Sequence, residues 1–248
     1  MDIKSSTKFC HYTSLANARN ILSSECFFLS SYNKMNDLAE ADLHADENQR
    51  VFVLSLCNSE ALNIPAFYLY GGIDGKGCRI QFTAAKMKEI LDSCSVSFVN
   101  KQMRRLKKTV SPSDYDVFYD WIYYISSNGF CEHGNEIASY GDFNNAVETL
   151  KKYNKHYFIK SPIWKYENEF RIVVLFHKNI PYERIALNYR IKDNDRGISV
   201  KLGPETSQEE YRSLTDEFLD YGISNCKQSS DQRIRMDLIA RNKELLKH

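Results

Sequence analysis

The segment WKYENEFRIVVLF, residues 164–176, determines how the rest of the chain is interpreted. Its second half, FRIVVLF at 170–176, is rich in β-branched and aromatic residues and predicts a buried strand. Side chains alternate between the two faces of a strand. The even-numbered side chains from 170 to 176 are all apolar, so this face is expected to lie in the core.

The odd-numbered face of the same segment is polar, because it gathers Glu167, Glu169 and Arg171 beside Trp164 and Tyr166. Two carboxylates and a guanidinium on one strand face are costly unless they are solvated, paired with each other or used in a site. From these residues alone, a functional site and an Arg–Glu pair on a solvent-facing sheet surface are equally good explanations.

Further strands and helices are predicted on both sides of this segment. Short apolar runs predict strands at 7–12, 26–30, 51–57, 78–82 and 198–202. Helical periodicity, Ser111-Pro112 and a capping box at Thr206 and Glu209 predict helices at about 15–22, 84–92, 112–125, 145–158 and 206–221. This irregular mixture favours an α+β fold over a doubly wound parallel sheet. We expect one domain over 1–248, with a helical insertion at about 84–160 and a charged C-terminal helix.

Composition excludes several classes of protein. The 248 residues carry 33 Lys and Arg against 32 Asp and Glu, a formal net charge of +1, which argues against a dedicated nucleic-acid binder. The seven cysteines form no CxxC pair, and no apolar run approaches the roughly 18–20 residues of a membrane span. The N-terminus lacks the apolar core of a signal peptide. A reduced, cytoplasmic protein with no membrane partner is therefore expected.

Nucleotide-binding loops of the two common kinds are absent from the sequence. No GxGxxG follows a strand and no GxxxxGK[ST] occurs, so Rossmann and P-loop sites are excluded. His11-Tyr12-Thr13 is a separate candidate, because it ends a predicted strand just before a helix, where anionic ligands are favoured. The alternative is a histidine that satisfies local backbone groups.

The loop after the second predicted strand carries small polar and acidic residues. Ser30-Ser31 is followed by Asn36-Asp37 and Glu40. These residues are candidates for a site, although the same types make turns and helix caps.

Two further features are weaker evidence for a functional site. The run Lys101–Lys108 has five positive charges in eight residues and could contact phosphates, but such runs are usually solvated faces. The other histidines (His44, His133, His156, His177 and His248) show no metal-ligand spacing, and no GxSxG appears. No metal is expected.

Several motifs taken together resemble a bacterial domain-of-unknown-function family. They are HYTS at 11–14, MNDLAE at 35–40, WKYENEFR at 164–171 and the segment ending in Leu-Gly-Pro at 198–204. Leu38 stands where the family usually has Pro. A third family motif with Trp and His is represented only by FYLY at 67–70 and GKG at 75–77.

That family is distantly similar to ADP-ribosyltransferases, including DNA-modifying toxins of the DarT type. The resemblance implies a mixed or antiparallel sheet core with flanking helices. It also implies that His11 holds the NAD ribose, that Glu169 is the catalytic carboxylate and that Glu167 is the first member of an E-x-E pair. Tyr12, Thr13, Ser30, Trp164, Tyr166 and Arg171 are the other expected NAD-binding residues, with the aromatic rings stacking on the bases and Arg171 pairing with pyrophosphate.

The implied activity is transfer of ADP-ribose from NAD to a macromolecule, either protein or nucleic acid, or hydrolysis of NAD. Such an activity would suit a toxin or an anti-phage effector acting with a regulator. Fold alone does not fix function. A non-catalytic module that binds a nucleotide or a partner protein is the main alternative, and a nucleic-acid-processing factor that uses residues 101–108 is a weaker one.

Overall fold

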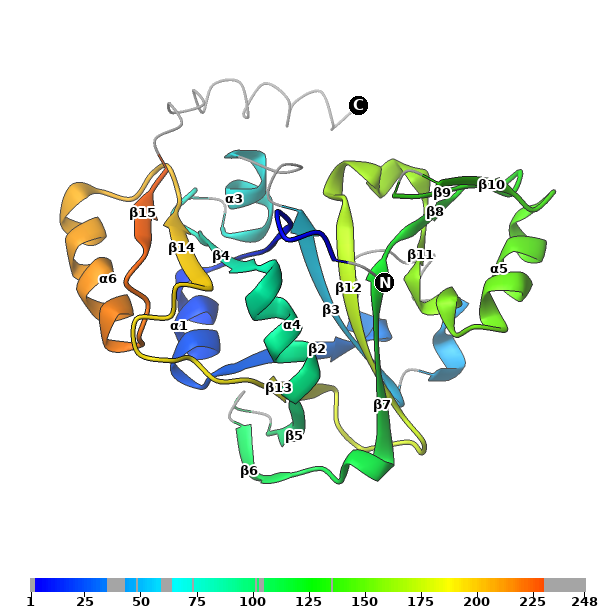
Figure 1. The fold of residues 1–248 in the computed structure, drawn as a ribbon, viewed down its shortest axis with the longest axis horizontal. Helices are drawn as coiled ribbons and strands as arrows, with labels where there is room; N and C mark the ends of the chain where they lie inside the picture. Colours follow the sequence, from blue (N-terminus) through cyan, green and yellow to red (C-terminus); the bar gives the residue numbers. More distant parts are fainter. Residues whose placement is uncertain are drawn as a thin grey trace.

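Two β-sheets form the framework of the protein in the computed structural model (Figure 1), which has the expected α+β class. The structure describes residues 3–34, 43–47, 49–58, 64–72, 74–100, 102, 105–134 and 136–229. The main sheet has eleven strands and the second sheet has four. No helix in these ranges is long and apolar enough to cross a membrane.

The main sheet runs in the order β15-β14-β4-β1-β3-β2-β13-β5-β6, and β12 and β7 continue from the other edge of β3. Among the described strands, its pairings are antiparallel except for β14 with β15. The strand bounds are Lys8–Thr13 (β1), Cys26–Ser31 (β2), Val51–Asn58 (β3), Cys78–Thr83 (β4), Ser95–Val99 (β5), Arg105–Thr109 (β6), Tyr115–Trp121 (β7), Glu169–Phe176 (β12), Arg184–Asn188 (β13), Ile198–Leu202 (β14) and Cys226–Gln228 (β15).

Strand β3 has two partners along one edge. Its C-terminal end pairs with β1, where Cys10 faces Cys57, and its earlier part pairs with β2, where Ser30 faces Val53. Between these two registers, residues 54–56 of β3 have no strand partner on that edge within the described part of the chain. The sheet therefore divides at β3, as β1 and β2 separate from each other.

Helices pack on the main sheet through their apolar faces. The four-turn helix α6 begins at a capping box formed by Ser207 and Glu210, one residue later than the predicted pair. Buried side chains of α1, α4 and α6 join the largest core cluster together with the even-numbered side chains of β12. The helix bounds are Leu15–Ser23 (α1), Ile64–Tyr70 (α3), Ala84–Ser93 (α4), Phe143–Lys151 (α5) and Gln208–Asp220 (α6).

The second sheet covers the other face of β12. Its order is β10-β9-β8-β11, and α5 packs against it at the end of the molecule opposite α6 (Figure 1). Val53 and Val173 of the main sheet form a smaller core with Tyr124 and Phe158 of this layer. The bounds are Tyr123–Ile125 (β8), Phe130–His133 (β9), Glu136–Ser139 (β10) and Ile159–Lys160 (β11), with 3₁₀ helices at Lys155–Phe158 (η4) and Pro162–Glu167 (η5).

The expected helical insertion at 84–160 is wrong over its middle. Pro112 begins only a short 3₁₀ turn, Pro112–Asp114, and the predicted helix at about 112–125 is instead β7 and β8. Tyr, Phe, Val and Trp are good strand formers, and pairing of β7 with β12 along its whole length decides the outcome. The expected C-terminal helix lies outside the described residues.

Candidate functional site

A pocket of about 280 Å³ opens where β1 and β2 separate along β3. Residues 53–57 of β3 form its floor, because the edge between the two strand partners is open. Six of the nine expected site residues line this pocket: His11, Tyr12, Ser30, Trp164, Glu167 and Glu169. The structure thus brings together the first strand, the second strand and the WKYENEFR segment.

Glu169 is the most constrained group in the pocket. Its carboxylate oxygen Oε1 accepts hydrogen bonds from Ser55 Oγ at 2.6 Å and from Arg171 Nε at 2.8 Å, and Oε2 accepts one from Lys160 Nζ at 3.0 Å. Its backbone N–H donates to the Tyr124 hydroxyl at 3.0 Å. The carboxylate is therefore fixed in position while it still lines the pocket.

Glu169 is ionised in this setting. Burial raises the pKa of its carboxyl, but the charges of Arg171 and Lys160 and the hydrogen bonds from Arg171 and Ser55 outweigh burial and lower the pKa to about 2. A buried carboxylate with this much positive charge beside it is a permanent anion at neutral pH.

Lys160 joins the two carboxylates of the E-x-E pair. Its Nζ lies 2.6 Å from Glu167 Oε2 and 3.0 Å from Glu169 Oε2, and 4.6 Å from the centre of the Trp164 ring. The Tyr70 hydroxyl donates a hydrogen bond to the other oxygen of Glu167. Burial lowers the pKa of Lys160, but the carboxylates of Glu169 and Glu167 raise it by a larger amount. The pKa is therefore raised overall, and the ammonium stays charged.

Local backbone geometry explains how both carboxylates reach one lysine. Pro162 starts η5, where its missing N–H costs nothing. Asn168 ends η5 in the left-handed conformation, with φ of 41°, which Asn tolerates better than most residues. This turn reverses the chain into β12 and places Glu167 and Glu169 on either side of Lys160.

His11 approaches Glu169 through Ser55. Its imidazole makes a hydrogen bond with the backbone of Ser55, and the hydroxyl of Ser55 donates to Glu169. Burial lowers the pKa of His11 despite this bond. The ring is therefore neutral, and it lines the pocket.

Three expected site residues lie elsewhere. Thr13 is buried, and Tyr166 is 47% exposed; neither is among the described residues that line the pocket. Arg171 is 0% exposed and lies behind Glu169, where its Nη1 donates to the Tyr157 carbonyl at 2.9 Å. The expectation that Arg171 pairs with a pyrophosphate is wrong, because the second sheet covers this face of β12.

The pocket also contains residues that were not among the nine expected site residues. Lys160, Ser55, Tyr70 and Lys34 all line it. Lys160 lies just beyond the helix predicted at about 145–158, and Ser55 lies in a strand that is otherwise apolar. A polar residue in the middle of VFVLSLC was the one available signal, because such a position needs a partner when buried.

Other candidates from the sequence fall outside this site. Asn36, Asp37 and Glu40 lie outside the described residues, as do Lys101 and two further members of the basic run. The described end of that run forms edge strand β6, where Arg105 Nη1 donates to Asn188 Oδ1 at 3.1 Å.

Comparisons of the chain with protein-family models, with curated proteins and with solved structures found no match. The resemblance to ADP-ribosyltransferases therefore rests on the motifs quoted above, and the arrangement of the pocket carries the functional argument.

Proposed function

We propose that the pocket binds NAD and that the protein is an ADP-ribosyltransferase-like enzyme, which transfers ADP-ribose to a macromolecule or hydrolyses NAD. One observation carries the proposal: a neutral His11 and an ionised Glu169, far apart in the sequence, line the same pocket and are connected through Ser55.

The chemistry needs a fixed negative charge beside the ribose. The bond between C1′ of the ribose and the nicotinamide nitrogen breaks, and nicotinamide leaves with the bonding electron pair. The ribose then carries oxocarbenium-like positive charge, until an acceptor hydroxyl or a water molecule attacks C1′ and releases a proton. A carboxylate already held in place stabilises that charge without reorganisation.

Glu169 has the geometry for this role. Among the bonds between described residues, its Oε2 accepts only the one from Lys160, so a ribose hydroxyl can donate to the same oxygen. His11 would hold the ribose from the opposite wall. Tyr12 and Trp164 would supply the aromatic surfaces for the nicotinamide ring.

The size of the pocket indicates how NAD would lie. Its volume of about 280 Å³ is at the lower end for ligand pockets, which run from about 300 to 1,000 Å³. It would enclose the nicotinamide and its ribose and leave the adenylate at the mouth. The Lys34 side chain is 43% exposed and lies 3.5 Å from Glu183, and it would replace Arg171 as the partner of the pyrophosphate.

The direct test measures nicotinamide release from NAD by purified protein, with and without cell lysate as a source of acceptor. Glu169→Asp is the informative variant, because it keeps the charge that Arg171 and Lys160 require and withdraws the carboxylate by one methylene. We expect a loss of about 10²-fold or more in turnover. Glu217→Asp is the matched control, since Glu217 pairs with Arg19 on the surface, away from the pocket.

Release that Glu169→Asp leaves unchanged would contradict the catalytic assignment. Dependence of release on lysate would indicate transfer to an acceptor, and release without lysate would indicate hydrolysis.

The same contacts support a second candidate, a nucleotide-binding module without turnover. The carboxylates of Glu167 and Glu169 are both engaged by Lys160, which is also the arrangement of a structural ion cluster. Stabilisation by NAD without nicotinamide release, with and without lysate, would favour this candidate.

A further inference from the structure

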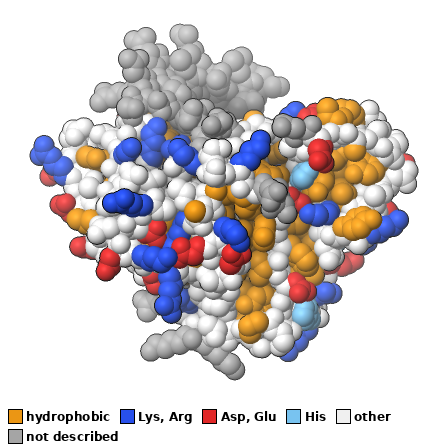
Figure 2. Space-filling view, viewed as in Figure 1, with side chains coloured by type: hydrophobic (Ala, Val, Ile, Leu, Met, Phe, Trp, Pro, Cys, Tyr) orange, Lys and Arg blue, Asp and Glu red, His pale blue; other side chains and the backbone are white. Residues whose placement is uncertain are grey.

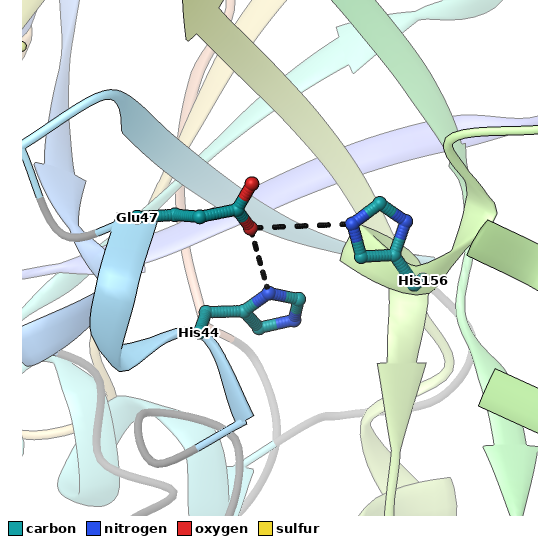
Figure 3. A group of neighbouring side chains, drawn as sticks. All are labelled: His44, Glu47 and His156. Atoms are coloured by element: carbon teal, nitrogen blue, oxygen red, sulfur yellow. Dashed lines mark hydrogen bonds and ion pairs between the residues drawn. The ribbon is translucent and has the colours of Figure 1, made fainter. Parts of the chain in front are cut away.

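A second polar cluster lies on the far side of Arg171 from the pocket. It consists of His44 and Glu47, at the 3₁₀ helix η2 (Ala45–Glu47), and His156 in η4. Both imidazoles point toward one carboxylate oxygen of Glu47 (Figure 3). We propose that these three residues form a binding site for one divalent transition-metal ion of the zinc class.

The distances suit three ligands around a small cation. His44 Nδ1 lies 3.3 Å and His156 Nε2 lies 4.0 Å from Glu47 Oε2, and the three ligand atoms are all within 4.8 Å of one another. Zinc bonds of about 2.0–2.1 Å at tetrahedral angles place neighbouring ligand atoms about 3.3–3.4 Å apart. The first separation already fits, and the others need small side-chain movements.

Several imidazole nitrogens of the cluster lack a hydrogen bond within the described part of the chain. His44 Nε2 and His156 Nδ1 are buried and have no hydrogen-bond partner among the described residues. At 4.0 Å, His156 Nε2 is also too far from Glu47 for a hydrogen bond. An ion held between His44 Nδ1 and His156 Nε2 would give His156 Nε2 the interaction that Glu47 is too far away to supply, and it would leave His44 Nε2 and His156 Nδ1 as they are.

The surroundings prepare Glu47 as a ligand. The Tyr157 hydroxyl donates to Glu47 Oε1 at 2.9 Å, which orients the carboxylate and leaves Oε2 for the metal. Such outer contacts are typical of metal sites. The Tyr32 ring stacks on His44 at 4.2 Å between ring centres and fixes the plane of the imidazole.

Charge and protonation also agree with metal binding. Burial lowers the pKa of His156 and lowers that of His44 to about 4, so both rings are neutral, the form that coordinates metal. Arg171 is a cation near His44 and Lys151 is a cation near His156, and the charge of Arg171 is paired with that of Glu169. The ion therefore meets a neutral pair of rings and one carboxylate.

Two histidines and one carboxylate leave one position of a tetrahedral zinc ion open for water. The Glu47 side chain is 28% exposed, which gives an ion access from solvent. Because η2 and η4 are distant in the sequence, a bound ion would link the segment that precedes β3 to the segment that precedes β11 of the second sheet. Metal binding to the folded state alone raises its stability.

The test uses untagged, chelator-treated full-length protein. Zn²⁺ is titrated by calorimetry, and Co²⁺ by the visible absorption of its four-coordinate complexes. We expect one equivalent to bind, with a rise in melting temperature that a chelator reverses. Glu47→Gln and His156→Gln are each expected to weaken binding by at least about tenfold.

His177→Gln is the matched control, because His177 is an exposed histidine paired with Asp116. It should bind Zn²⁺ like the wild type. Wild-type protein that binds no Zn²⁺ would overturn the proposal whatever the variants do. Undiminished one-equivalent binding in both Glu47→Gln and His156→Gln would overturn it as well, because the ion would then lie elsewhere.

Discussion

The pocket around Glu169 and the cluster around Glu47 differ in how their polar groups are satisfied. In the pocket, each oxygen of Glu169 has a donor from the chain, and Lys160 and Arg171 balance the carboxylates. In the cluster, two buried imidazole nitrogens have no partner among the described residues. Tyr157 connects the pocket's ion cluster with the histidine cluster. Its carbonyl accepts a hydrogen bond from Arg171, and its hydroxyl donates one to Glu47.

The two groups of buried polar side chains therefore differ in whether the protein alone satisfies them. The chain itself completes the ion cluster of the pocket, so the free protein holds Glu169 ready for a ligand. The histidine cluster is incomplete on the side facing Glu47, because His156 Nε2 lies 4.0 Å from Glu47 Oε2, too far for a hydrogen bond, and we expect a bound ion to fill that gap. Figure 2 shows charged side chains of both signs spread over the visible surface.

The largest effect is expected from breaking the ion cluster at Arg171. Arg171→Met keeps much of the volume but leaves Lys160 as the remaining charge partner of Glu169 among the described residues. Removing one member of a buried ion pair costs about 3–5 kcal/mol, and we expect a loss of this size in the free energy of unfolding measured by urea denaturation. Arg19→Met, at an ion pair whose arginine is 44% exposed, should cost less than about 1 kcal/mol.

A double variant sharpens this prediction. Arg171→Met with Glu169→Gln removes both charges, and it should be less destabilised than the sum of the single variants. Strict additivity of the two losses would show that the two side chains do not depend on each other.

A smaller effect is expected at Ser55. Ser55→Ala removes one hydrogen bond to an ionised carboxylate and should cost about 1.5–3 kcal/mol in the free energy of unfolding. The same substitution at Ser111, whose hydroxyl pairs with that of Ser113 at an exposed site, should cost far less. Equal losses at the two positions would contradict the role given to Ser55.

The smallest effect concerns the pH dependence of stability. Burial lowers the pKa of His11, so its ring stays neutral below about pH 6.5, where an unfolded histidine takes up a proton. Unfolding then binds a proton, and the free energy of unfolding falls as pH falls below about 6.5. His11 contributes up to about 1.4 kcal/mol per pH unit to this slope.

His11→Gln should therefore flatten the fall in stability between neutral pH and the pKa of the folded state, as measured by denaturation at a series of pH values. His177→Gln, at the exposed histidine, serves as the control. An unchanged slope in His11→Gln would mean that the His11 ring is not buried as described.

Only part of the environment of β12 could be predicted from the sequence. The apolar face of β12 is confirmed, since Phe170 and Ile172 are fully buried in the main core. The opposite face was expected either in a site or in solvent, but Arg171 is covered by the second sheet. Nothing local in the sequence signals that covering layer, because it depends on residues 123–125 pairing as strand β8 of the second sheet and not forming the end of a helix.

Non-local partners account for the other residues that were missed. Lys160 lies in the two-residue strand β11, and the turn at Asn168 brings Glu167 and Glu169 back beside its side chain. His44 and His156 have no ligand spacing along the chain, yet η2 and η4 place them around Glu47. Spacing rules detect sites built within one segment and not sites assembled by the tertiary fold.

The central claim is that NAD binds where β1 and β2 separate along β3. Hydrogen–deuterium exchange in the presence of a carbocyclic NAD analogue, whose glycosidic bond cannot be cleaved, tests this location independently of turnover. We predict slower exchange in peptides that cover residues 8–13, 26–31 and 51–58, with the segment 160–171 protected as well. Protection confined to other segments, or none at saturating analogue, would contradict the assignment of the pocket.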